Sequence, residues 1–156
     1  MVPFVKNDAS MIKRKLRTVV VDDSLVCRKA AVSYLSKIFQ GPALMMTPTF
    51  EECGDGDEAV QLIQSTMQTN MDALPDVIFM DSHMMKMDGV KATEKLRSIG
   101  YKGIIAALTG NVFQDDIDAF TRAGANVVLP KPLCESDMRS LLTMLKEAVR
   151  ERLLGR

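Results

Sequence analysis

Five short and mostly apolar segments, each followed by a stretch with helical spacing, constrain the fold of this chain more than any other feature. They cover residues 18–21, 47–53, 77–80, 104–108 and 127–129. Short apolar runs without alternation are typical of buried strands in a parallel sheet. We therefore predict an α/β fold with a single doubly wound five-stranded parallel sheet and five helices, of the flavodoxin-like type.

Capping residues and glycines set the expected helix boundaries. Ser24 is a suitable N-cap for a first helix that ends at Gly41, and Asp57 is expected to cap the second helix, which carries Ala59 to Met67. The remaining helices are expected at about 90–99, 114–123 and 136–153. The last helix is expected to turn one apolar face inward, formed by Met138, Leu141, Leu142, Leu145, Ala148 and Val149.

The length of 156 residues favours one domain. We predict that this domain spans residues 17–150, after a basic extension or linker at 1–16 and before a short tail at 151–156. The 20 basic and 20 acidic residues balance, so the chain has no overall positive field to hold nucleic acid. Its apolar runs are also too short to span a bilayer.

The three cysteines, Cys27, Cys53 and Cys134, lack the CxxC spacing of a redox or metal site. An odd and sparse set of this kind is typical of small hydrophobic residues in a reducing compartment. We therefore expect a cytoplasmic location, with the nucleus as the alternative.

Polar residues follow four of the five predicted strands. Right-handed crossovers bring the carboxyl ends of all parallel strands to one edge of the sheet, where ligands bind in such folds. These residues are Asp22 and Asp23 after the first strand, Asp81 after the third, Thr109 after the fourth and Lys131 after the fifth. Helix caps and strand ends alone would explain one or two of them, but not the whole set.

Three clustered carboxylates repel one another unless a cation lies among them. Oxygen ligands without histidine or cysteine partners favour a hard cation, and Mg²⁺ fits a site with few carboxylates. A carboxylate can also attack phosphorus, so we assign Asp81 as the nucleophile and Asp22 and Asp23 as metal ligands. Lys131 would then pair with a phosphoryl oxygen, to which the Thr109 hydroxyl can donate a hydrogen bond.

These motifs resemble those of the receiver domains of two-component signalling, and the resemblance runs from Thr18 to about Val149. The matching residues appear in the expected order at the expected strand ends. They are Asp22-Asp23-Ser24, Met80-Asp81, Met84, Met87-Asp88-Gly89, Leu108-Thr109-Gly110 and Lys131-Pro132. The runs Asp23 to Lys29 and Met87 to Val90 look most like the receivers of hybrid histidine kinases.

The resemblance implies that Asp81 accepts a phosphoryl group in a Mg²⁺-dependent reaction. It also implies that the backbone carbonyl of His83 completes the metal site beside Asp22, Asp23 and Asp81. The partner would be a histidine kinase or a histidine phosphotransfer protein, and the chain would be either a separate regulator or a segment of a hybrid kinase. Such a module is not an enzyme, since it catalyses only its own phosphorylation and dephosphorylation.

The sequence departs from the family pattern at two positions. Met85 stands where the family usually has proline, four residues after the acceptor, and Val128 stands where it often has a switch aromatic. The side chain of His83 is interpreted as an exposed loop residue, or alternatively as one that tunes the lifetime of the phosphate.

Two other functions use similar topologies. An aspartate-nucleophile phosphatase would carry a second acid two residues after its nucleophile, where this chain has His83. This function stays the alternative, although the chain shows no cap domain. A nucleotide-binding module would need a glycine-rich GxxxxGK[ST] loop, which the sequence does not contain.

Overall fold

The computed structural model describes residues 15–41 and 46–153 of the chain. Five strands in this part form one parallel sheet in the order β2-β1-β3-β4-β5. The strands are β1 (Lys15–Val21), β2 (Thr47–Cys53), β3 (Val77–Asp81), β4 (Ile104–Thr109) and β5 (Val127–Pro130). The helices are α1 (Leu25–Phe39), α2 (Gly56–Thr69), α3 (Gly89–Ser98), α4 (Gln114–Ala123) and α5 (Glu135–Leu153), with a short 3₁₀ helix η1 (Met71–Ala73).

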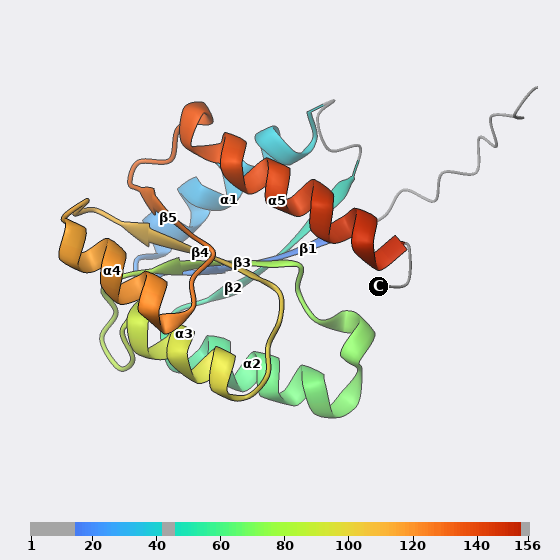
Figure 1. Ribbon diagram of the computed structural model, residues 1–156, viewed down its shortest axis with the longest axis horizontal. Helices are drawn as coiled ribbons and strands as arrows, with labels where there is room; N and C mark the ends of the chain where they lie inside the picture. The colour runs from blue at the N-terminus through green and yellow to red at the C-terminus, as the bar shows by residue number, and fades with distance from the viewer. Residues whose placement is uncertain (1–14, 42–45, 154–156) are drawn as a thin grey trace, which may run out of the picture.

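The helices cover both faces of the sheet, so the molecule has three layers (Figure 1). Helices α1 and α5 pack with Leu16, Val20 and Phe79 on one face. Helices α2, α3 and α4 pack on the opposite face with neighbouring strand residues such as Val19 and Ile78. Successive strand residues therefore serve two cores, which explains why the strands lack polar alternation. The predicted doubly wound α/β fold is confirmed.

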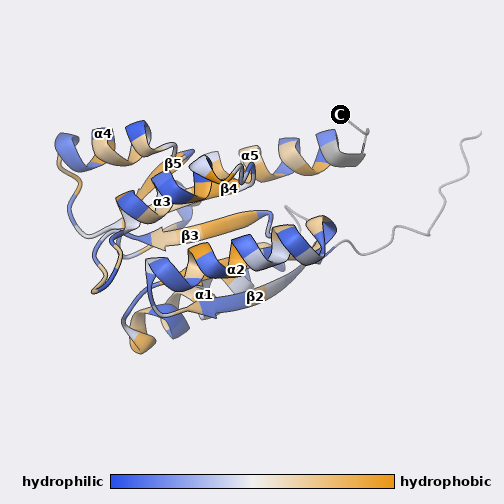
Figure 2. Ribbon diagram, turned by 90° about the horizontal axis from the view of Figure 1, so that it is seen from below, coloured by the Kyte–Doolittle hydropathy of each residue, from blue (hydrophilic) through white to orange (hydrophobic). Residues whose placement is uncertain are grey.

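The central strands β3 and β4 are buried along their whole length, whereas the edge strand β2 is mostly exposed. Figure 2 shows β3 mainly in the orange of hydrophobic residues, while β2 carries the blue of hydrophilic ones. This difference follows from the strand order, because β2 has a neighbour on one side only. Strand β1 begins at Lys15, three residues before the predicted start at Thr18, because Lys15 pairs with Thr47 of β2.

Three sequence predictions need correction. Helix α2 has Asp55 as its N-cap, and not Asp57, because Asp55 has extended backbone and its carboxylate accepts a bond from the Asp57 N–H. Cys27 and Cys134 are exposed, so only Cys53 behaves as a buried hydrophobic residue. Ala148 is exposed, because the fully buried face of α5 ends one turn earlier, at Leu145.

The predicted extension at 1–16 lies largely outside the described residues, as do the last three residues of the predicted tail at 151–156. The domain boundaries therefore stay predictions. Within residues 15–41 and 46–153, no helix is both long enough and apolar enough to cross a membrane.

Candidate functional site

The strand register brings the predicted site residues to one edge of the sheet. Asp22 and Asp23 directly follow β1, Asp81 ends β3, and Lys131 directly follows β5. Because β1 lies beside β3 in parallel register, with Val21 opposite Met80, their carboxyl ends meet at the same level. The chain thus positions these side chains through the backbone hydrogen bonds that join its parallel strands.

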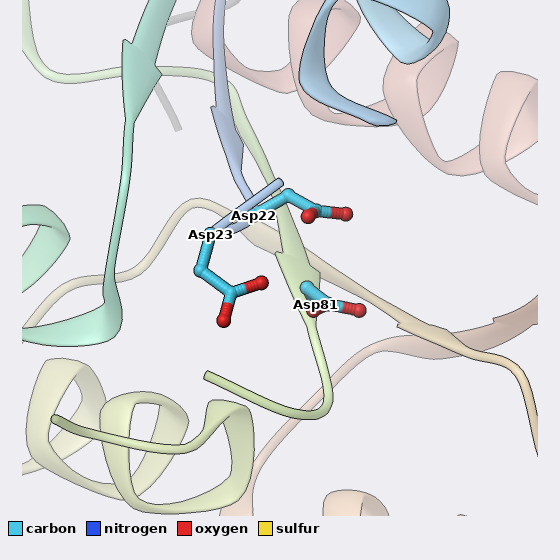
Figure 3. Close-up of side chains that lie close together, drawn as sticks. All are labelled: Asp22, Asp23 and Asp81. Carbon is cyan, nitrogen blue, oxygen red and sulfur yellow. The ribbon is translucent and has the colours of Figure 1, made fainter. Parts of the chain in front are cut away.

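Asp22, Asp23 and Asp81 form an acidic cluster whose closest carboxylate oxygens all lie within 4.8 Å of one another (Figure 3). Asp22 and Asp81 are buried, at 3% and 6% exposure, whereas Asp23 is exposed. The backbone N–H of Ser24 donates to Asp22 Oδ1 at 2.9 Å, which fixes the orientation of this carboxylate. The cluster therefore has a rigid inner side and one face open to solvent.

Lys131 contacts the two buried members of the cluster. Its Nζ lies 2.7 Å from Asp22 Oδ2 and 2.5 Å from Asp81 Oδ1. Burial alone would lower the pKa of Lys131, but the two carboxylates raise it above its ordinary value. The ammonium therefore stays charged and neutralises part of the acidic cluster.

Burial raises the pKa of Asp81, and the neighbouring Asp22 raises it further, while the hydrogen bond from Lys131 opposes both effects. The free energy cost of ionising Asp81 therefore depends on the local positive charge. A cation beside the cluster would lower this cost and favour the carboxylate form.

The donor set of the acidic cluster fits Mg²⁺. All three side chains offer carboxylate oxygens, and one side of the cluster is open, which leaves space for water or a phosphate oxygen. Hard oxygen donors of this kind select Mg²⁺ or Ca²⁺ over the softer transition metals. Three carboxylates are few for a Ca²⁺ cage, so Mg²⁺ is the better fit.

Thr109 is fully buried at the end of β4, next to the strand of Asp81. Its hydroxyl donates to the carbonyl oxygen of Asn111 at 2.8 Å and accepts a bond from the Asn111 N–H at 3.1 Å. In this state the hydroxyl is thus bound by its own loop, and it must rotate before it can donate to a group on Asp81.

The loop after Asp81 exposes the side chain of His83, whose Nδ1 lies 2.8 Å from Ser82 Oγ. This agrees with the interpretation of His83 as an exposed loop residue, while the metal-binding role of its carbonyl stays a prediction. Met85 in the same loop is 90% exposed. Val128, at the position of the family's switch aromatic, is half-buried against the core formed with α2, α3 and α4.

Sequence reasoning gave Asp55 no role in the site. This residue is 4% exposed and accepts hydrogen bonds from the backbone of Lys86 and Met87, both in the loop that follows Asp81. The sequence signal for this contact is weak, because an acidic residue between two glycines, here Gly54 and Gly56, is also typical of an ordinary turn.

The fold and the edge cluster define an α/β module with a carboxylate and lysine site at the carboxyl ends of its strands. The chain belongs to the family of response regulator receiver domains, whose model matches residues 18–143. The resemblance predicted from the sequence motifs is therefore confirmed.

Several relatives contain a similar segment. Transcription factor SKN7 of Chaetomium thermophilum is 35% identical over 130 residues, which cover 83% of this chain and 15% of the relative. Histidine kinase CKI1 of Arabidopsis thaliana is 34% identical over 131 residues, which cover 77% of this chain and 11% of the kinase. The two-component response regulator ORR41 of Oryza sativa subsp. japonica is 29% identical over 139 residues, 88% of this chain and 100% of the relative. The chain thus spans a small part of two of these relatives and the full length of the third.

Solved structures show the same architecture. The receiver domain of CKI1 from Arabidopsis thaliana, complexed with Mg²⁺ and BeF₃⁻, is 30% identical, with a TM-score of 0.62 over 86% of this chain and 89% of that chain. The receiver domain of the putative regulator NarL from Mycobacterium tuberculosis is 22% identical, with a TM-score of 0.67 over 85% of this chain and 98% of that chain. The second comparison supports the fold alone.

Proposed function

We propose that this chain is a phosphoacceptor receiver in a histidine-to-aspartate phosphorelay, and that phosphorylation of Asp81 switches its conformation and partner binding. The observation that carries this proposal is the buried Asp81 carboxylate, which contacts the Lys131 ammonium and clusters with the acidic pair Asp22 and Asp23. A carboxylate in such surroundings is a suitable nucleophile for phosphorus. The CKI1 receiver complexed with Mg²⁺ and BeF₃⁻, a relative of this chain, supports the same assignment.

In the proposed reaction an oxygen of Asp81 attacks the phosphorus of the donor. The new O–P bond forms an acyl phosphate while the bond from phosphorus to the donor nitrogen or oxygen breaks, and the leaving group keeps the electron pair. Bound Mg²⁺, held by Asp22, Asp23, Asp81 and the carbonyl of His83, would supply positive charge to the phosphoryl oxygens. Burial of Asp22 and Asp81 keeps bulk water away from the inner side of the site.

The proposed switch uses Lys131 and Thr109. After phosphorylation, the Lys131 ammonium would exchange its contact with Asp81 Oδ1 for a phosphoryl oxygen. The Thr109 hydroxyl would leave the carbonyl of Asn111 and donate to another phosphoryl oxygen, which would pull on the loop between β4 and α4. Because Val128 replaces the switch aromatic, we expect a smaller rearrangement of the face between β4 and α5 than an aromatic flip would give.

The proposed phosphodonor is a histidine kinase or a histidine phosphotransfer protein. Relatives that include the histidine kinase CKI1 and histidine protein kinase 1 of Candida albicans support a place within a hybrid kinase. The full-length match to ORR41 supports a separate regulator equally well. We further propose a cytoplasmic or nuclear location, supported by the free thiols of Cys27, Cys53 and Cys134.

Phosphorylation by acetyl phosphate in the presence of Mg²⁺, followed by intact mass spectrometry, tests the function. We expect the mass of one added phosphoryl group, which hydroxylamine removes because the bond is an acyl phosphate. Asp81→Asn should abolish the addition, whereas the control Asp72→Asn, which changes an exposed carboxylate of η1 outside the acidic cluster, should keep it. A phosphoryl group that persists in Asp81→Asn would overturn the assignment.

The same experiment separates the receiver from the alternative phosphatase. A receiver retains its phosphoryl group and consumes about one donor molecule for each phosphorylation cycle. A phosphatase would release inorganic phosphate from many donors in rapid turnover, and that result would overturn the proposal that the chain acts only on itself.

A further inference from the structure

The loop between β3 and α3, residues 82–88, connects the nucleophile to the rest of the molecule. It begins directly after Asp81 and contains His83, whose carbonyl is the proposed metal ligand. A hydrogen bond of 3.0 Å from the Gly89 N–H to the Ser82 carbonyl closes the base of the loop. The position of the loop therefore decides where the carbonyl of His83 lies relative to Asp81.

Asp55 holds the far side of this loop. Its Oδ2 accepts a hydrogen bond from the Lys86 N–H at 2.9 Å, and its Oδ1 accepts one from the Met87 N–H at 2.9 Å. Asp55 lies 31 and 32 residues before these partners, so the two bonds join separate parts of the chain. Both oxygens of one carboxylate are thus committed to the backbone of the 82–88 loop.

The electrostatic surroundings keep Asp55 ionised. Burial alone would raise the pKa of this carboxyl, but hydrogen bonds from the backbone of Lys86, Met87, Asp57 and Gly56 outweigh burial and lower its pKa. A charged acceptor binds N–H donors more strongly than a neutral one. Asp55 is therefore a strong anchor for the loop at neutral pH.

Other contacts of the loop show that its backbone is held at α2, in addition to the side chains of Met84 and Met87, which pack against the core. Met85 is 90% exposed and the side chain of Lys86 is 68% exposed, and the Lys86 ammonium forms a long ion pair of 3.7 Å with the half-buried Asp57. By contrast, the backbones of Gly56 and Met87 are so close that a Cβ on Gly56 would lie 2.5 Å from the Met87 carbonyl oxygen. The loop thus contacts the start of α2 directly through its backbone.

We infer that Asp55 is a positioning residue for phosphoryl transfer, which sets the 82–88 loop and through it the metal-binding geometry at Asp81 and His83. The inference rests on the proposed function, because it assigns Asp55 a role in the same reaction. Outer contacts that orient metal ligands typically change metal affinity or activity by 10–100-fold when they are removed. Asp55 does not contact the reacting atoms and acts only through the loop.

The test compares Asp55→Ala, Asp55→Asn and the control Asp57→Asn, which removes a neighbouring half-buried charge and leaves both loop bonds to Asp55 in place. The first measurement is amide hydrogen exchange of Lys86 and Met87 in the metal-free protein. The second is Mg²⁺ affinity from amide chemical shifts, and the third is the rate of phosphorylation by acetyl phosphate, resolved into kcat and KM.

We expect Asp55→Ala to speed exchange at both amides and to weaken Mg²⁺ binding and kcat by about tenfold, with KM for acetyl phosphate nearly unchanged. Asp55→Asn keeps one acceptor oxygen, so its values should lie between those of the wild type and Asp55→Ala. Asp57→Asn should match the wild type in all three measurements. If Asp55→Ala does not fold, Asp55→Asn should still show faster exchange, weaker Mg²⁺ binding and a lower kcat than Asp57→Asn.

Faster exchange at Lys86 and Met87 with unchanged Mg²⁺ affinity and rate would overturn the inference, since the contact would then be structural only. A wild type that binds Mg²⁺ but gains no phosphoryl group would instead refute the proposed function. In that case the exchange and affinity measurements still decide whether Asp55 positions the metal site.

Discussion

Replacement of Asp23 by asparagine tests whether the acidic cluster is built for a cation. The closest oxygens of Asp22, Asp23 and Asp81 lie within 4.8 Å of one another. At about this separation two unit charges repel by roughly 1 kcal/mol in water and roughly 3.5 kcal/mol at an effective dielectric constant of 20. The lower value applies to Asp23, because its side chain is exposed.

The net effect on Asp23 also includes Lys131, which lies against both other carboxylates. We count the charge of Lys131 as offsetting one of the two repulsions that Asp23 feels, so about one repulsion remains and Asp23→Asn should stabilise the metal-free protein by about 1 kcal/mol. A change of this size raises the melting temperature by about 2–4 °C in a domain of about 150 residues. The variant is therefore expected to be more stable than the wild type without Mg²⁺.

Addition of Mg²⁺ should reverse this order. At a concentration of about ten times its dissociation constant, a ligand stabilises the folded protein by about 1.4 kcal/mol. The wild type should gain this amount, whereas Asp23→Asn should gain much less because it lacks one ligand. Urea denaturation of the wild type and Asp23→Asn, each with and without Mg²⁺, measures the four stabilities. The distant variant Glu147→Gln serves as the control. Equal stabilisation of both proteins by Mg²⁺ would refute the reasoning.

Three further predictions follow from individual contacts. Gly89→Ala should destabilise the fold by about 1–3 kcal/mol in urea denaturation, since its Cβ would overlap the Asp81 carbonyl oxygen; an unchanged midpoint would contradict this. Burial raises the pKa of Cys53 to about 12, so a thiol reagent at pH 8 should modify the other two cysteines in the folded protein and all three after denaturation. Lys131→Met should cost about 2 kcal/mol of stability at neutral pH. Because the folded protein raises the pKa of Lys131, this difference should be constant from neutral pH to about pH 10.5 and should shrink as the pH rises further. A difference that grows above pH 10.5 would contradict the prediction.

The fold was predictable because each strand has a direct sequence signal. Apolar runs such as 77–80 and 104–108 follow from burial on both faces, and parallel topology then brings Asp22 and Asp81 to one edge without further information. The polar residues at the strand ends thus predicted that the carboxylates lie close together. The start of β1 at Lys15 was missed, because it depends on pairing with β2 rather than on hydrophobicity.

Hydrogen bonds between side chains and backbone groups could not be predicted. The role of Asp55 depends on the N–H groups of Lys86 and Met87, and a backbone N–H has no signature in the sequence. The bond of Thr109 to the Asn111 carbonyl is a second example, since only the local loop conformation decides it. Helical periodicity placed Ala148 on the inward face of α5, but periodicity does not show where along the helix the buried face ends.

The two edge strands described above also limit how this molecule can aggregate or recruit partners. Strand β2 contains Pro48, which has no N–H to offer, and the exposed charges of Glu51 and Glu52. Strand β5 has only four residues and ends at Pro130. Neither edge is a good template for an added strand, so association by sheet extension is disfavoured. A partner that detects the state of Asp81 must therefore recognise helices and loops.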